Sequence, residues 1–297
     1  MEFIQSNDLS TGEEIKLSFK SYGKGRPVVL IHGWPSSKEM WEYQIEDLVN
    51  NGLRVVKYDR RGFGKSSKPW GLYNYDAFAE DLDALMTQLD LQDAVLIGFS
   101  MGGGEVARYL SRFGSSRVSK VVLISTVLPF MLKTEDNPEG VDSEVFQKML
   151  EAINEDRIGF LENFGKQFFG VNLINHPVSN SYLQYFTNLA AVASPNATKQ
   201  AAMAFANTDF RKDLPAINVE TLIIHGDADK IVPIDASSAR TSKLIPNCQY
   251  LVYEGAPHGL FYTHKDRLNQ DLLDFILGPE TLQTSYLNKD NSTFIVE

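Results

Sequence analysis

The sequence predicts an α/β fold built on a mostly parallel sheet, and three observations support this. Short apolar runs rich in Val, Ile and Leu recur along the 297-residue chain. These runs do not alternate polar with apolar residues, which is typical of strands covered by helices on both faces. Segments with helical spacing lie between them, and alternating strands and helices indicate an α/β architecture. A chain of this length forms one large domain, or one domain with an insertion.

The individual elements follow from the same patterns. Six apolar runs are expected to be strands, and they span residues 27–33, 53–59, 94–100, 120–126, 221–227 and 249–255. The first 22 residues look like antiparallel strands that precede them. Apolar residues at helical spacing predict helices over two segments, 75–90 and 265–277.

Residues 127–214 break this rhythm, because no strand-like run occurs there. The segment reads as a helical insertion that is crowded with aromatic residues, namely Phe146, Phe160, Phe164, Phe168, Phe169, Tyr182, Tyr185, Phe186 and Phe205. Most of these rings are expected to form the core of the insertion. Some are expected to line a cavity where the insertion faces the sheet, since ligand pockets favour such boundaries.

Composition excludes several classes of function. The formal net charge of −10 argues against a nucleic-acid partner, which requires a basic surface. The single cysteine, Cys248, excludes an internal disulfide and is interpreted as a small buried thiol in a strand. No apolar run is long enough to span a membrane, and the N-terminus lacks the pattern of a signal peptide, so a cytoplasmic protein is expected.

The run "LIGFSMGGGE" (96–105) contains the pattern G-x-S-x-G around Ser100. It lies between a predicted strand and a predicted helix, the context in which this pattern presents a nucleophilic serine on a sharp turn. Gly98 and Gly102 are expected because side chains there would collide with neighbouring backbone. Gly103 and Gly104 are expected to let the helix pack closely on the sheet.

A nucleophilic serine needs a base and an acid. His258, in "EGAPHGLF", follows the last predicted strand, where catalytic loops of α/β sheets gather. "HGDAD" follows the preceding strand and offers Asp227 and Asp229. Asp229 lies farther into the loop and is favoured as the acid, whereas Asp227 is expected to bond backbone amides locally.

An oxyanion formed in acyl transfer requires two N–H donors. The amides of Met101, after the serine, and Trp34, in the loop after the first core strand, are the candidates. His32 in that loop is expected to brace it by hydrogen bonds, because no other metal-ligating residues stand near it at ligand spacing. The Gly-rich run "DRRGFGKSS" (59–67) lacks P-loop spacing and is interpreted as a strand-to-helix turn with exposed charge.

Five runs together, "LIHGWP", "DRRGFGKSS", "GFSMGGGEVARY", "IIHGDADKIVP" and "EGAPHG", resemble the cofactor-free (non-haem) haloperoxidase and aryl esterase branch of the α/β-hydrolase superfamily. The resemblance covers roughly residues 20–277. It implies the α/β-hydrolase fold, an eight-stranded, mostly parallel sheet with helices on both faces. The core would comprise 1–126 and 215–277, with a helical cap at 127–214. No role is predicted for the C-terminal tail, 278–297.

The same resemblance implies functional residues and an activity. It implies a triad of Ser100, Asp229 and His258, an oxyanion hole of Trp34 and Met101, and an acyl pocket bordered by Ile231 and Val232. Such enzymes use no cofactor or metal and hydrolyse small esters through an acyl-serine. Many also perform perhydrolysis, in which hydrogen peroxide replaces water and the released peracid oxidises halide.

Alternatives remain open from the sequence. A lactonase, a lactamase or a carbon–carbon bond hydrolase could use the same triad. A ligand receptor on a hydrolase fold is a further alternative, which the complete triad and donor loop disfavour. The expected partner is a small ester or related acyl compound, with no nucleic acid and no membrane, and the sequence leaves homo-oligomer formation open.

Overall fold

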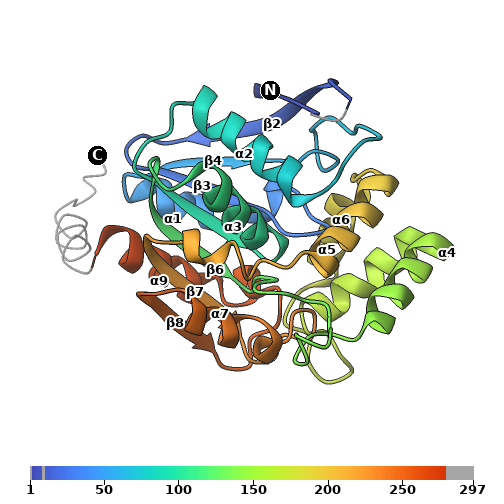
Figure 1. Ribbon diagram of the computed structural model, residues 1–297. Coiled ribbons are helices and arrows are strands. Elements are labelled where there is room, and N and C mark those ends of the chain that lie inside the picture. The colour runs from blue at the N-terminus through green and yellow to red at the C-terminus, as the bar shows by residue number, and fades with distance from the viewer. Residues whose placement is uncertain (1, 9–10, 279–297) are drawn as a thin grey trace, which may run out of the picture.

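The computed structural model describes residues 2–8 and 11–278, so the predicted tail from residue 279 onward lies outside the described residues. A twisted sheet runs through the centre of the molecule, with helices on both faces (Figure 1). It contains eight strands in the order β1-β2-β4-β3-β5-β6-β7-β8. Their bounds are β1 Glu2–Asn7, β2 Glu14–Tyr22, β3 Pro27–Ile31, β4 Arg54–Tyr58, β5 Ala94–Phe99, β6 Val118–Ile124, β7 Glu220–Gly226 and β8 Cys248–Tyr253.

Strand directions agree with the predicted class. β2 is antiparallel to both β1 and β4, and the remaining neighbours are parallel. Each of the six apolar runs matches one strand to within two residues at either end, and the N-terminal residues form the expected antiparallel pair. Several strands end one or two residues earlier than predicted. The residues beyond them turn out of the sheet to form the loops of the candidate site.

All of the core helices except the last two connect these strands by crossovers, and those two follow β8. The core helices are α1 Glu42–Asn50, α2 Tyr75–Gln88, α3 Met101–Phe113, α7 Ser238–Leu244, α8 Leu260–Thr263 and α9 Lys265–Leu277, and 3₁₀ turns span Lys38–Trp41, Leu214–Ala216 and Ile234–Ala236. The chain passes from β3 to β4 in one direction across the sheet, and then to β5 and β6 in the other. Right-handed crossovers therefore place α1 on the face opposite α2 and α3. α1 packs against α9, and α2 packs against α3.

Three helices lie in the chain between β6 and β7, and they gather at one end of the molecule (Figure 1). They are α4 Ser143–Phe168, α5 Asn180–Ala191 and α6 Pro195–Asn207. α4 is interrupted at Asp156, whose φ of −148° and ψ of 90° are not helical. Ser179 and Ser194 cap α5 and α6, because each side chain accepts a hydrogen bond from a first-turn amide.

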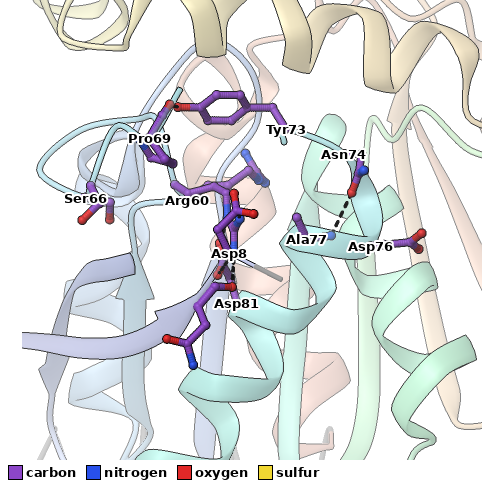
Figure 2. A network of polar contacts seen from close by, with 12 residues as sticks. Asp8, Arg60, Ser66, Pro69, Tyr73, Asn74, Asp76, Ala77 and Asp81 are labelled. Atoms are coloured by element: carbon purple, nitrogen blue, oxygen red, sulfur yellow. Dashed lines mark hydrogen bonds and ion pairs between the residues drawn. The ribbon is translucent and has the colours of Figure 1, made fainter. Parts of the chain in front are cut away.

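The loop 59–67 corrects one expectation. Its arginines were expected to be exposed, but Arg60 and Arg61 are 0% and 1% exposed. Arg61 donates to both carboxylate oxygens of Asp81, at 2.6 and 2.7 Å, and lies 3.4 Å from Asp8. Figure 2 shows Asp8 close to Asp81, which lies in the middle of α2; Asn74 caps the start of this helix by accepting from the Ala77 amide at 2.9 Å. A buried guanidinium is stable here because carboxylates compensate its charge.

Cys248 corrects a second expectation. The thiol was expected to be buried, but the residue is only partly buried at the start of β8. β8 is an edge strand, so helices cover it less completely than the central strands. The Sγ atom donates to the Ser242 carbonyl at 3.2 Å, and burial raises the pKa of the Cys248 thiol.

Candidate active site

Ser100 occupies the turn between β5 and α3 with strained backbone. Its φ of 53° and ψ of −118° lie in a region that L-residues rarely adopt. Such strain persists only where the surroundings fix the turn, and it is common at functional sites. The Ser100 amide donates to the Ile124 carbonyl at 2.8 Å, and its carbonyl accepts from the Gly103 amide at 3.0 Å. The turn is therefore tied to both β6 and α3.

The glycines around Ser100 are explained by close approach of backbone. A Cβ on Gly98 would lie 2.7 Å from the Gly102 carbonyl oxygen, and one on Gly102 would lie 2.6 Å from the Ile31 carbonyl oxygen. A Cβ on Gly103 would collide with the Thr126 side chain. The prediction that side chains at Gly98 and Gly102 would collide with backbone is confirmed, and Gly103 closely approaches Thr126, just beyond the end of β6. The prediction for Gly104 is wrong, because a Cβ there would meet the Tyr75 and Phe210 rings and not the sheet.

The fold brings the predicted Ser100, His258 and Asp229 side chains into one hydrogen-bonded series. The Ser100 hydroxyl lies 3.0 Å from His258 Nε2, and His258 Nδ1 lies 2.6 Å from Asp229 Oδ2. Because the carboxylate accepts from Nδ1–H, Nε2 is left to accept from the serine hydroxyl. All three residues are buried. The serine and the acid are thus each within hydrogen-bonding distance of the histidine, which is the arrangement of a catalytic triad.

Asp229 is held as a carboxylate. Burial alone would raise its pKa, but His258 and His225 beside it hold the pKa of Asp229 well below its ordinary value. Its Oδ1 atom accepts from the amides of Ile231 and Val232, both at 2.9 Å. These bonds fix the carboxylate and the following loop together.

His225 also contacts this carboxylate, a feature that the sequence analysis missed. Its Nε2 lies 2.9 Å from the Val232 carbonyl and 3.2 Å from Asp229 Oδ2. A carbonyl can only accept, so Nε2 carries the hydrogen, and Nδ1 accepts from the Ser238 hydroxyl at 2.5 Å. The spacing of His225 and Asp229 in "HGDAD", four residues apart at a strand end, was the available signal.

We expect His225→Leu to lower kcat for ester hydrolysis about three- to tenfold. The variant removes the Nε2–H group that lies 3.2 Å from Asp229 Oδ2, so the buried carboxylate has one donor fewer and holds the His258 ring less firmly. His225→Gln keeps a donor near this position and should retain most of the wild-type kcat. Equal kcat values in both variants and the wild type would contradict this role.

The predicted oxyanion donors, Trp34 and Met101, lie just beyond the ends of two neighbouring strands, β3 and β5. Trp34 lies in the loop after β3, Met101 opens α3, and β3 pairs with β5. Within residues 2–8 and 11–278, neither backbone N–H has a protein acceptor. The Trp34 indole donates to the Thr198 carbonyl at 2.9 Å, and its ring packs edge-on against Phe164 at 5.1 Å. Contacts to α4 and α6 therefore hold this loop.

His32 braces the same loop, as predicted. Its Nδ1–H donates to the Gly33 carbonyl at 2.9 Å, and its Nε2 accepts from the Arg60 amide at 3.1 Å. Burial, followed by the nearby Arg60 guanidinium, lowers the pKa of His32 well below its usual value. The ring is therefore neutral, which this pair of hydrogen bonds requires.

A buried ion pair between Arg60 and Glu105 holds His32 in place, and the sequence analysis did not find it. Arg60 Nη2 donates to the His32 carbonyl at 2.8 Å, and Arg60 Nε donates to Glu105 Oε2 at 2.6 Å. The Tyr58 hydroxyl donates to the other Glu105 oxygen. Both side chains of the ion pair are fully buried. Glu105, on α3, is thereby coupled to the loop that carries Trp34.

A cavity of about 310 Å³ opens beside Ser100. Trp34, Ile231 and Val232 line it, which places the two predicted pocket residues at the cavity wall. Aromatic residues from the segment between β6 and β7 supply much of the rest, namely Phe146, Phe160, Phe164 and Phe205. The expectation that some aromatic residues of the insertion line a cavity is confirmed. Others pack around the triad, where the Phe168 ring meets the His258 ring edge-on at 4.7 Å.

Asp227, the other aspartate of the run "HGDAD", lies outside the triad. It accepts from a backbone amide, as predicted, but the bond is not local: Asp227 Oδ1 accepts from the amide of Gly255, in the loop after β8, at 2.6 Å. His176 is exposed. Among residues 2–8 and 11–278, no group of three or more His, Cys, Asp or Glu side chains is placed to hold a metal ion. In the same residues, no helix combines the length and the apolar character needed to cross a membrane.

Comparison with known proteins supports the class that the fold and site indicate. Residues 26–265 match the family model described as the alpha/beta hydrolase fold. The chain is 42% identical to a non-heme haloperoxidase of Rhodococcus erythropolis, over 93% of this chain and 99% of that protein. It is 36% identical to a bifunctional esterase/perhydrolase of Acinetobacter calcoaceticus, over 90% of this chain and 98% of that protein.

A solved structure gives the same result. The crystal structure of a bromoperoxidase from Bacillus anthracis has a TM-score of 0.88 and 46% sequence identity, and the alignment covers 93% of this chain and 99% of that one. The chain therefore belongs to the non-haem haloperoxidase family of α/β-hydrolases, and it is a hydrolase.

Proposed function

We propose that the protein hydrolyses small carboxylic esters through an acyl-serine intermediate, with perhydrolysis as a side activity. The observation that carries the proposal is the continuous series Ser100–His258–Asp229, with the Ser100 hydroxyl 3.0 Å from the base and Ser100 in the wall of the apolar cavity. The names of the esterase/perhydrolase and haloperoxidase relatives support the same reaction class.

In the acylation step, Ser100 Oγ attacks the ester carbonyl while its proton passes to His258 Nε2. The carbonyl oxygen becomes an oxyanion, which the Trp34 and Met101 amides stabilise. Asp229 orients the imidazole and stabilises its charged form. The C–O bond to the alcohol then breaks, and His258 returns the proton to the leaving oxygen.

In the deacylation step, His258 removes a proton from water as the water oxygen attacks the acyl carbon. The bond between the acyl group and Ser100 Oγ then breaks, His258 returns the proton to Oγ, and the acid is released. Hydrogen peroxide in place of water releases a peracid by the same proton transfers. The peracid then transfers an oxygen to halide, giving the acid and a hypohalite. The enzyme itself undergoes no redox change, so these steps proceed without a cofactor.

The proposal includes a division of the chain. Residues 1–126 and 215–277 would form the hydrolase core, and 127–214 would act as a cap that closes the cavity and selects the acyl group. Contacts of Trp34 with Thr198 and Phe164 support this, because they couple the oxyanion loop directly to the cap helices. Ile231 and Val232 would border the acyl chain from the core side.

Labelling with a 4-nitrophenyl alkylphosphonate tests the proposal. The serine oxygen displaces 4-nitrophenolate and forms a stable P–O bond that mimics the tetrahedral intermediate. We expect release of one equivalent of 4-nitrophenolate per chain, loss of esterase activity in parallel, and a mass increase on the peptide that contains Ser100. Labelling of another serine, or full labelling without loss of activity, would overturn the proposal.

A further inference from the structure

The charged residues that line the cavity beside Ser100 are all basic, although the protein as a whole is acidic. The chain has 38 acidic and 28 basic residues, yet no Asp or Glu lines this cavity. Its charged lining residues are Lys148 and Lys230, and the remaining wall is mainly apolar. An acidic protein therefore presents a cationic entrance to its candidate active site.

The two lysines differ in their surroundings. Lys148 Nζ lies 2.8 Å from a Glu144 oxygen, so a neighbouring charge compensates it. Lys230 makes no side-chain hydrogen bond or ion pair within the part of the chain that the structure describes, and it is exposed. Lys230 is thus the cavity's uncompensated positive charge.

Lys230 also lines two neighbouring cavities. It and Gln167 line both the cavity beside Ser100 and a second hollow of about 650 Å³, whose wall includes Asn172, Asn175 and His264. No Asp or Glu lines the second hollow either. Gln167 likewise makes no side-chain hydrogen bond to the described residues, so its amide is available in the same two cavity walls as Lys230.

The backbone at Lys230 is fixed relative to the triad. Lys230 directly follows Asp229, whose Oδ1 atom accepts from the amides of the next two residues, Ile231 and Val232. The backbone of Lys230 is therefore held beside the triad, and its exposed side chain extends from this point into the cavity wall. A substrate that reaches from the serine along the apolar wall meets this charge at its far end.

We propose that Lys230, with Gln167 beside it, binds a carboxylate that the substrate carries away from the bond to be cleaved. The preferred substrates are then esters with an apolar body and an anionic end, such as half-esters of dicarboxylic acids. This inference rests on the proposed esterase function and adds the substrate class. The apolar wall contacts the body of the substrate, and the ammonium group selects its charged end.

Matched substrate pairs test this at either end of the ester. On the acyl side, 4-nitrophenyl hydrogen glutarate is compared with 4-nitrophenyl pentanoate. On the alcohol side, 4-acetoxybenzoate is compared with its methyl ester. In at least one pair, Lys230→Met should lower kcat/KM for the charged member about three- to tenfold, the range for a partly solvated ion pair, and change the neutral member less than about twofold. The pair that responds identifies the end that carries the carboxylate.

Lys148→Met is the matched control, because it removes a compensated lysine from the same cavity. It should change the charged-to-neutral ratio less than about twofold, and 0.5 M NaCl should reduce the wild-type preference by screening. An unchanged ratio in Lys230→Met for both pairs would overturn the inference, and so would an equal change in Lys148→Met.

A binding measurement separates this inference from the proposed function. Glutarate binding is measured by titration calorimetry and requires no catalysis. Wild type should bind glutarate about three- to tenfold more tightly than Lys230→Met. If neither ester of either pair is cleaved, the proposed function fails, and glutarate binding alone decides the role of Lys230. Equal glutarate affinities in the two proteins would overturn it.

Discussion

Replacing Ser100 with alanine is expected to lower kcat for 4-nitrophenyl acetate hydrolysis by a factor on the order of 10⁴ to 10⁶. The hydroxyl is the group 3.0 Å from His258 Nε2, and alanine leaves no atom there that can form the acyl intermediate. Peroxide-dependent bromide oxidation should fall with it, because both reactions are proposed to use the same acyl-serine. The two rates are measured in parallel, with circular dichroism to confirm the fold.

Ser111 provides a matched control on the same helix. It is exposed on α3, so Ser111→Ala removes a hydroxyl without touching the site and should retain full activity. If Ser100→Ala keeps esterase activity near the wild-type rate, the acyl-serine mechanism is wrong. If it loses esterase but keeps peroxide-dependent activity, the two reactions do not share a nucleophile.

Replacing Glu105 with alanine is expected to lower the free energy of unfolding by about 3–5 kcal/mol. The change leaves the Arg60 guanidinium buried without its carboxylate, and it removes the acceptor of the Tyr58 hydroxyl. Arg60 also donates to the His32 carbonyl, so the oxyanion loop should loosen and kcat should fall in the folded fraction. Urea denaturation gives the stability, and assays well below the midpoint give kcat.

Two control variants test whether the loss of stability in Glu105→Ala comes from the buried, unpaired charge of Arg60. Glu220→Ala removes a carboxylate from an ion pair with Lys120, and its side chain is 68% exposed, so it should cost less than about 1 kcal/mol. The double variant Arg60→Leu/Glu105→Leu removes both charges and should recover much of the stability lost in Glu105→Ala. A loss below 1 kcal/mol in Glu105→Ala would show that Arg60 does not depend on this carboxylate.

Local features were predictable because short-range chemistry sets them. The glycines around Ser100 follow from steric contacts within a single turn, and the apolar runs follow from burial on both faces of the sheet. The helix over Lys265–Leu277 has the predicted bounds. The placement of His258 and Asp229 after successive strands also came from the pattern, since parallel strands end at a common edge.

The same local reasoning failed for Arg60 and Arg61. A run of charged residues in a loop is usually solvated, and nothing nearby in the sequence offers them partners. Their carboxylates are Glu105 and Asp81, which belong to α3 and α2. The contact of His225 with Asp229 was missed for a related reason, because it depends on how the loop folds back through Val232.

The sequence by itself determined the fold class, the strained serine turn and the residue types of the site, since each depends on spacing along a short stretch of chain. Only the tertiary structure decided which distant groups meet. Because β3 pairs with β5, the Trp34 loop lies near Ser100. Because β7 and β8 lie in the same parallel sheet, the loops that follow them bring Asp229 and His258 to Ser100. Such contacts join residues up to 158 positions apart, and their distances are set by the packing of the sheet and not by the intervening chain.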